Sequence, residues 1–388
     1  MLFGESGSLH KMNMKRRLTI PPLAFAPPQS AGHPLEIVQF HAWRLKEPVS
    51  GRRYTVVELQ SRSGETGYGE GGPVPAAEIV EARAAIQGRR VTESEFVRAR
   101  LAGIPAMEAA VGNAMLDLFS KSRKVPIYQF LGGPTRFKAR LLARLEGSDE
   151  ASAAAPLERA KRQGFRAFTL PALQRDAMIP LQEYVDRVRA QVAKMQSMGG
   201  STAEWVLDGA AAMTPGDAAT VAKALERVHM IWFDEPTNVL TTDGLAKITD
   251  ESVMPIGLGR KIHDIPAFQN LLRQASVNVL RPGLGLNSLT KIKRIAALAE
   301  THYVAVAPYH EGGPIGAMAG VQLAAALANS YAVDVPVPTA DRDAAMRAEL
   351  TSGNKEAAEN GFAALMNRPG LGFEVNRKAL DTYSEERI

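Results

Sequence analysis

The fold is decided by three short stretches, Trp205-Val-Leu-Asp208, Trp232-Phe-Asp-Glu-Pro236 and Ile256-Gly-Leu-Gly-Arg260. In each, a short apolar run typical of a buried strand leads into a charged residue, and these charged residues follow one another at intervals of 26 positions. A helix-like stretch separates each strand from the next. This repeat predicts a parallel α/β barrel, which brings the carboxyl ends of its strands to one rim, where such barrels form their active sites.

The same rhythm extends in both directions from these stretches. Seven barrel strands are predicted in all, as given at the end of this paragraph. A helical pattern over Leu289–Glu300 lies between the sixth and the seventh, and another over Ile315–Ala328 follows the seventh, before an irregular region. The tail over Arg368–Asn376 predicts a tight turn and a final short strand. The predicted barrel strands are Ala139–Leu145, Arg166–Leu170, Glu204–Leu207, Met230–Phe233, Met254–Gly257, Val277–Leu280 and Tyr303–Val306.

A different pattern precedes the barrel. Leu35–Trp43 and Tyr54–Leu59 are predicted strands, and the glycine-rich segment Gly67–Pro75 is predicted to be a loop. Apolar residues at three- and four-residue spacing predict a helix over Ile104–Lys121. The break at Leu131-Gly-Gly-Pro134 marks the predicted boundary between the two domains.

Composition excludes several classes of protein. The chain has 388 residues, of which 45% are hydrophobic and 22% charged, with a net charge of +5. Its basic residues are scattered, so we expect no nucleic-acid surface. It has no cysteine, which excludes disulfides and thiolate metal sites. No run of about 18 apolar residues occurs, so no membrane span is predicted.

The N-terminus allows two interpretations. Met14-Lys-Arg-Arg17 followed by the apolar stretch Leu18–Ala26 has the outline of an export signal, if Met14 is the true start. Two prolines interrupt that stretch, which favours a cytoplasmic protein with an N-terminal tail instead. Both a periplasmic and a cytoplasmic location stay open, with the cytoplasm favoured.

Five segments in order give the chain a family resemblance. They are Gly67-Tyr-Gly-Glu70, Ala114–Leu118 leading to Leu131-Gly-Gly133, Trp232–Pro236, Ala307-Pro308 with Gly313–Gly316, and Arg368–Glu374. Together they resemble the enolase superfamily, in its mandelate racemase and muconate-lactonizing enzyme branch, of which this chain looks like a divergent member. The resemblance implies a modified TIM barrel, (β/α)7β, with an N-terminal α+β capping domain. The expected parts are a tail at 1–34, the capping domain at 35–135, the barrel at 136–350, and a C-terminal segment at 351–388 that returns to the cap.

The resemblance also implies a chemistry. Members of the family abstract a proton next to a carboxylate, with Mg²⁺ stabilising the enediolate and Lys or His acting as base. The first two metal-ligand positions map to Asp208 and Asp234. Glu235 is a candidate third ligand, although neighbouring strand residues point to opposite faces.

Arg260 occupies the third metal-ligand position. A guanidinium has no acceptor atom, so it cannot ligate a cation. Two unit charges 4 Å apart interact by roughly 4 kcal/mol at an effective dielectric of 20, and a dication would about double this repulsion. We therefore expect Arg260 to replace the cation and bridge Asp208 and Asp234. The alternative is a metal pair completed by Glu235 or water.

The expected bases are also changed. The family's Lys-x-Lys maps to Thr169-Leu-Pro171, and its sixth-strand position maps to Gly283, none of which can take a proton at pH 7. The seventh-strand base maps to His310 by spacing or to Tyr309 by motif register. His310 is therefore either a general acid/base or a histidine of the rim without a catalytic role.

Arginines and a lysine near the rim are candidate substrate ligands. Arg260 and Arg281 are predicted to bind a substrate carboxylate, since a bidentate arginine fits that geometry. For Lys261 and Arg281 two interpretations carry equal weight: each binds a substrate carboxylate, or each is a solvated charge on the surface. His263 is expected in a solvated loop.

Two functions follow from the resemblance. The first is an isomerase or lyase (a dehydratase) that removes the proton alpha to the carboxylate of a small hydroxy or sugar acid. The second is a catalytically inactive homologue that binds a carboxylate ligand or a protein partner, with Arg260 in place of the metal. The expected partners are a small-molecule carboxylate and further copies of the chain in a homo-oligomer, with no nucleic acid or membrane.

Overall fold

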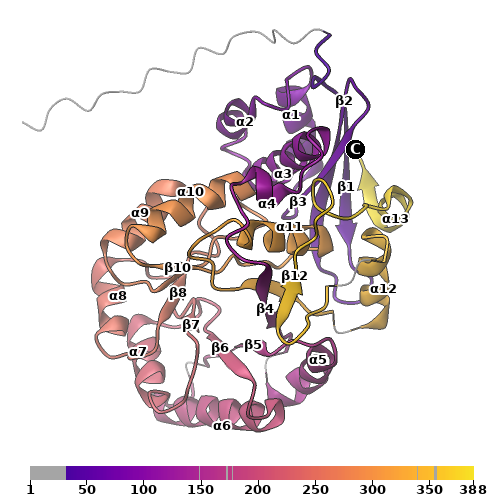
Figure 1. Ribbon diagram of the computed structural model, residues 1–388. Coiled ribbons are helices and arrows are strands. Elements are labelled where there is room, and N and C mark those ends of the chain that lie inside the picture. The colour runs from indigo at the N-terminus through magenta and orange to yellow at the C-terminus, as the bar shows by residue number, and fades with distance from the viewer. Residues whose placement is uncertain (1–31, 148, 172–173, 177, 339, 354–355) are drawn as a thin grey trace, which may run out of the picture.

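The computed structural model describes residues 32–388 except 148, 172–173, 177, 339 and 354–355. The candidate export signal at residues 14–26 therefore lies outside the described residues. Two units are joined in the fold, an antiparallel sheet with helices and a parallel barrel (Figure 1). This architecture confirms the predicted fold class. Within the described residues, no helix combines the length and apolar character needed to cross a bilayer.

The capping domain is a four-stranded antiparallel sheet in the order β13-β1-β2-β3, covered by helices. Its last strand comes from the other end of the chain, since β13 lies beside β1 (Figure 1). In this pair Trp43 lies opposite Arg387. Its elements are β1 (Ile37–Lys46), β2 (Arg53–Ser61), β3 (Thr66–Gly71), α1 (Ala76–Ile86), α2 (Ser94–Arg100), α3 (Pro105–Ser122), α4 (Ile127–Phe130), α13 (Arg377–Tyr383) and β13 (Ser384–Arg387).

The glycine-rich segment was wrongly predicted to be a loop along its whole length. Its first half forms β3, which pairs with β2. A Cβ atom on Gly67, Gly69 or Gly71 would clash with backbone atoms of α3. These glycines therefore allow the closest approach of a helix to a strand, rather than the unusual backbone angles of a turn.

The barrel contains eight parallel strands, joined edge to edge from β10 through β4 to β11. Bonds from the Tyr331 amide to the Val306 carbonyl and from the Asp334 amide to the Pro308 carbonyl connect the two outer strands. The strands are β4 (Lys138–Arg144), β5 (Ala167–Pro171), β6 (Glu204–Asp208), β7 (Phe233–Asp234), β8 (Ile256–Leu258), β9 (Val279–Leu280), β10 (Ala305–Val306) and β11 (Val333–Pro336).

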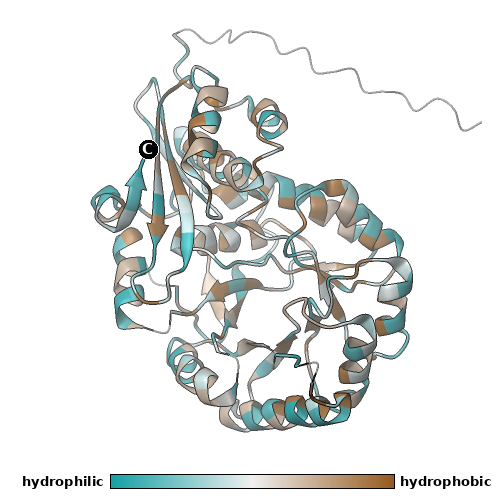
Figure 2. Cartoon of the chain, turned by 180° about the vertical axis from the view of Figure 1, so that it is seen from behind, coloured by the Kyte–Doolittle hydropathy of each residue, from teal (hydrophilic) through white to brown (hydrophobic). Residues whose placement is uncertain are grey.

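Helices surround the strands and carry both polar and apolar residues, consistent with one face packing on the barrel (Figure 2). The exception is α11, whose residues are all buried because it lies between the barrel and the cap and contacts both β11 and β3. The helices are α5 (Glu150–Arg162), α6 (Leu181–Gly199), α7 (Pro215–Ala224), α8 (Thr242–Thr249), α9 (Ile265–Arg273), α10 (Leu289–Glu300), α11 (Pro314–Ala324) and α12 (Asp341–Leu350).

Two parts of the C-terminal half differ from the sequence prediction. The region after the seventh barrel strand is not wholly irregular, because it contains β11, a strand of only four residues with a charged residue inside it. The predicted strand within Arg368–Asn376 is absent from these residues, which the structure describes in full. A short strand lies before them instead, β12 (Phe362–Ala364), which pairs antiparallel with β4.

Candidate active site

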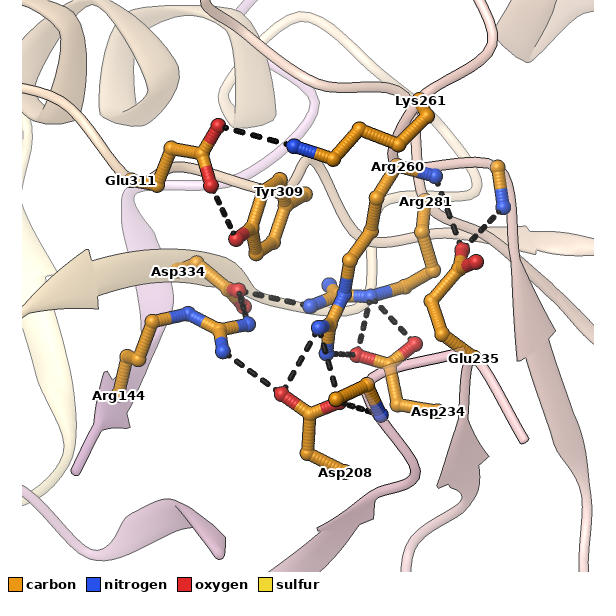
Figure 3. A network of polar contacts seen from close by, with 12 residues as sticks. Arg144, Asp208, Asp234, Glu235, Arg260, Lys261, Arg281, Tyr309, Glu311 and Asp334 are labelled. Atoms are coloured by element: carbon orange, nitrogen blue, oxygen red, sulfur yellow. Dashed lines mark hydrogen bonds and ion pairs between the residues drawn. The ribbon is translucent and has the colours of Figure 1, made fainter. Parts of the chain in front are cut away.

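Three aspartates and three arginines meet at the carboxyl ends of the barrel strands (Figure 3). The aspartate side chains are almost completely buried, and each belongs to a different strand. We call this group the Asp–Arg ring; its members are Arg144 in β4, Asp208 in β6, Asp234 in β7, Arg260 after β8, Arg281 after β9 and Asp334 in β11.

Two arginines link the three aspartates. Arg260 Nη1 donates to Oδ1 and Oδ2 of Asp208 at 2.9 and 2.8 Å, while its Nη2 donates to Asp234. The bridge expected from the sequence is thus present. Arg281 Nε donates to both oxygens of Asp234 at 3.0 Å, and its Nη2 donates to Asp334 Oδ2 at 2.7 Å.

Arg144 closes the ring. Its Nη1 donates to Asp208 Oδ2 at 2.8 Å and its Nη2 to Asp334 Oδ2 at 3.0 Å. Positive and negative side chains therefore alternate around the whole ring, and the three pairs leave no net charge (Figure 3). Such alternation compensates much of the desolvation cost of buried charges.

Tyr309 lies over the guanidinium groups. Its ring centre is 4.5 Å from the guanidinium carbon of Arg144, 4.6 Å from that of Arg260 and 5.9 Å from that of Arg281. Arg281 also lies 5.1 Å from the ring of Trp232. These distances are within the range of cation–π attraction, so the aromatic rings hold the arginines in place as well as covering them.

Electrostatic interactions within the ring keep Asp208 and Arg260 ionised. Burial disfavours the charged form of Asp208, but the charges and hydrogen bonds of Arg260 and Arg144 outweigh it and hold the pKa of this carboxyl well below its usual value. Burial likewise opposes the charge on Arg260, yet Asp234 and Asp208 raise the pKa of that guanidinium well above its usual value. No member whose pKa is shifted in this way is suited to exchange a proton near pH 7.

A cavity of about 700 Å³ lies above the ring, between the cap and the barrel. Tyr309 Oη donates to Glu311 Oε2 at 2.7 Å, and Lys261 Nζ lies 3.5 Å from Glu311 Oε1. Burial raises the pKa of the Tyr309 phenol, so that it stays protonated. The lining consists of Gly51–Arg53, Glu70–Pro73, Ala106, Arg260, Lys261, Gly283, Gly285, Leu286, Tyr309, Glu311 and Gly312.

Glu70 and His310 form a buried pair at the edge of this cavity. His310 Nε2 lies 2.7 Å from the carbonyl oxygen of Gly313 and 3.5 Å from Glu70 Oε1. Burial lowers the pKa of His310 to about 4 and raises that of Glu70 to about 7. Glu70 lines the cavity whereas His310 does not, so Glu70 is the member of the pair placed to meet a ligand.

The other residues singled out from the sequence fall in different places. Arg281 is completely buried in the ring and does not line the cavity, so its interpretation as solvated surface charge is wrong. Lys261 lines the cavity with an exposed side chain. Glu235 accepts from the amides of Gly259 and Arg260 at 2.6 and 2.9 Å, so its carboxylate is bonded to backbone rather than to the ring (Figure 3).

Four residues of this region were not predicted from the sequence. Arg144 and Asp334 complete the ring, and Glu70 and Glu311 supply carboxylates to the cavity. A signal existed for the first two, because each is a charged residue within an apolar strand, at Leu141-Leu-Ala-Arg144 and Val333-Asp-Val335. Glu311 directly follows Tyr309 and His310, the two candidates for the seventh-strand base.

The donor set does not fit Mg²⁺, the ion that the enolase superfamily generally uses. Both oxygens of Asp208 and of Asp234 already accept from guanidinium groups. No cluster of three or more His, Asp or Glu able to hold a metal occurs in the part of the chain that the structure describes.

Comparison with known proteins places the chain in a family. A family model described as "Enolase C-terminal domain-like" matches residues 152–379. D-galactonate dehydratase of Verminephrobacter eiseniae is 28% identical over 280 residues, covering 69% of this chain and 71% of that protein. D-xylonate dehydratase of Haloferax volcanii is 26% identical over 286 residues, covering 70% of this chain and 68% of that protein.

Solved structures agree with this. A mandelate racemase/muconate lactonizing enzyme-like protein from Rubrobacter xylanophilus superimposes with a TM-score of 0.80 at 22% identity, covering 91% of this chain and 98% of that one. A mandelate racemase/muconate lactonizing enzyme from a Jannaschia species gives the same TM-score and identity over 90% of this chain and 98% of that one. The chain belongs to the enolase superfamily, in its mandelate racemase/muconate-lactonizing enzyme branch.

Proposed function

We propose that this protein binds a small hydroxy acid or sugar acid in the cavity above the Asp–Arg ring and acts on it as a lyase or isomerase. The observation that carries this is the cavity itself, about 700 Å³ in volume and placed at the carboxyl ends of the barrel strands. That volume suits a small-molecule ligand, and that end of a barrel is where catalytic sites form. Similarity to sugar-acid dehydratases supports the substrate class.

Lys261 is the proposed ligand for the substrate carboxylate. Its side chain is 78% exposed, and its ion-pair partner Glu311 is 3.5 Å away, so the ammonium group can bind an incoming anion at little cost. The other cations of the cavity wall have carboxylate partners and side chains that are less exposed than that of Lys261. Arg52 pairs with Glu47, Arg53 pairs with Glu385, and Arg260 belongs to the ring.

Glu70 and Tyr309 are the proposed proton-transfer groups. In a dehydration, the proton at C2 is removed and the hydroxyl at C3 departs as water after taking up a proton. Glu70, with a pKa raised by burial to about 7, is matched to accept a proton near neutral pH. The phenol of Tyr309, which is protonated at this pH, is the proposed donor of the other proton, and Glu311, bonded to it, orients the hydroxyl group.

The test is a panel of sugar acids in D₂O, including D-galactonate and D-xylonate, followed by proton NMR. With the native protein we expect the C2 proton signal to disappear over time. This loss of signal should not occur with Glu70→Gln, and with Lys261→Met it should be slower because the KM is higher. Lys223→Met is the matched control, since Lys223 is also an exposed lysine paired with a glutamate, but on the outside of the barrel. Exchange at the wild-type rate in Glu70→Gln would contradict its role.

A second candidate is a protein that binds the same acid without turnover. The Asp–Arg ring favours it, because both oxygens of Asp208 and of Asp234 accept from arginines, which leaves these carboxylates unsuited to hold a metal that would stabilise an enediolate. Calorimetric binding of a sugar acid, weakened by Lys261→Met and accompanied by no C2 exchange, would establish this function. Exchange above the uncatalysed rate would exclude it.

A further inference from the structure

The Asp–Arg ring solves a problem that any barrel with acidic strand ends must solve. Asp208, Asp234 and Asp334 are 4%, 0% and 0% exposed, and three buried carboxylates repel one another unless positive charge lies between them. A divalent cation is one source of that charge. Here, each neighbouring pair of carboxylates is instead joined by one guanidinium group.

The atoms of the ring that lack a hydrogen-bond partner also indicate a site without a metal. Among its buried side-chain atoms, Nε of Arg144 and Nε of Arg260 lack a hydrogen-bond partner in the described part of the chain, as does Oδ1 of Asp334. Two of these three atoms are donors. A site with spare donors suits a water or an anionic oxygen, whereas a cation requires several free acceptors.

The three arginines differ in how they are anchored. Arg281 is enclosed in the barrel and also donates to the Ala307 carbonyl at 2.6 Å. Arg260 instead lines the cavity and contacts the ring only through its two terminal nitrogens. Its side chain lies between Asp208 and Asp234 and bonds to both. Among the described residues of the ring, Arg260 is thus the one that lines the cavity.

We propose that the guanidinium groups of Arg144, Arg260 and Arg281 replace a divalent cation at this barrel mouth, and that Arg260, which lines the cavity, occupies the place of the metal between Asp208 and Asp234. The native protein then folds without metal and has no Mg²⁺ site there. Exchanging Arg260 for an oxygen ligand creates such a site from Asp208, Asp234 and the new side chain. This inference concerns the metal alone and holds whether or not the protein turns over a sugar acid.

Calorimetric titration with Mg²⁺, and thermal unfolding with and without EDTA, test the proposal on the full chain. For the native protein we expect no binding heat up to millimolar Mg²⁺ and the same Tm in EDTA as in Mg²⁺. For Arg260→Glu we expect one bound ion and a Tm that rises with Mg²⁺ concentration, since ligand binding stabilises the folded state. Arg260→Met is the control, because it removes the guanidinium without adding a ligand, and its Tm should respond much less.

Two results would overturn the proposal. One is stoichiometric Mg²⁺ binding by the native protein that is lost in Asp208→Asn, which would place the ion at the ring itself. The other is a folded Arg260→Glu protein that binds no Mg²⁺. If Arg260→Glu does not fold, Arg260→Gln supplies an uncharged amide oxygen at the same position, and absence of binding by this folded variant counts equally against the proposal.

Discussion

The ring centre of Tyr309 lies 4.6 Å from the guanidinium carbon of Arg260. This contact joins the two layers of the site, because Tyr309 and Arg260 both line the cavity while Arg260 also belongs to the Asp–Arg ring beneath it. The cavity wall therefore includes an arginine packed against an aromatic ring. The aromatic face of Tyr309 contacts the Asp–Arg ring, whereas its hydroxyl group bonds to Glu311, so the two parts of this side chain can be tested by different substitutions.

Two substitutions at Tyr309 separate these effects. Tyr309→Phe keeps the aromatic face over the arginines and removes only the hydrogen bond to Glu311, so we expect a loss of about 1 kcal/mol in the free energy of unfolding. Tyr309→Leu also removes the cation–π contacts and should cost about 1–2 kcal/mol more. Urea denaturation measures both; equal losses would mean that the aromatic face contributes nothing.

Arg281→Met tests the energetics of the ring. The change leaves Asp234 and Asp334 each short of a charged partner in a fully buried position, so we expect the free energy of unfolding to fall by about 3–5 kcal/mol. Arg53→Met is the control, since Arg53 is half exposed and pairs with Glu385 on the surface, a contact worth less than about 1 kcal/mol. Similar losses in both variants would show that the ion pairs of the ring stabilise the fold no more than a surface ion pair does.

His310 gives stability a pH dependence of known sign. Its pKa in the folded state, about 4, is below its ordinary value of 6.5, so the unfolded chain binds more protons between these values. Its contribution therefore rises as pH increases from about 4 to about 6.5 and is fully present above that. In His310→Gln, the rise in denaturation midpoint over this range should be smaller than in the native protein, and an unchanged profile would contradict the prediction.

Glu70 contributes with the opposite sign. Its folded-state pKa of about 7 exceeds its ordinary value of 4.5, so the folded protein holds the extra proton between those values. Stability from this group is therefore present below about pH 4.5 and is lost as pH rises through about 7. Between pH 4.5 and 7, the free energy of unfolding of Glu70→Gln should therefore decline less than that of the native protein. The same decline in both proteins would be evidence against a raised pKa of Glu70.

The close packing of β3 on α3 gives a prediction for the cap. A methyl group on Gly69 would clash with the Ala110 carbonyl, so Gly69→Ala should cost at least about 1–3 kcal/mol as the helix shifts away. Gly103→Ala is the matched control, because nothing lies within 4 Å of a Cβ at that loop position, and its effect should stay within about 0.5 kcal/mol. Thermal unfolding of the two variants measures the difference.

The barrel could be predicted from the sequence because the repeat of one strand and one helix is visible in the spacing of residues along the chain. Asp208, Asp234 and Arg260 recur every 26 residues, and that interval fits one strand and one helix, so their shared rim followed from the repeat. Even the bridge by Arg260 was predictable, since an arginine between two carboxylates on one rim has few other partners. The match of α10 to the predicted helix Leu289–Glu300 has the same local origin.

Only the tertiary structure decided which distant groups complete the site. Arg144 and Asp334 are 190 residues apart in the chain and meet because the first and eighth strands of a closed barrel are neighbours. Packing of the cap on the barrel brings Glu70 of β3 within 3.5 Å of His310, and of the two only Glu70 lines the cavity. Spacing along the sequence fixes what each strand end carries, whereas barrel closure and domain packing fix which charges lie within bonding distance, because they join segments that no local pattern relates.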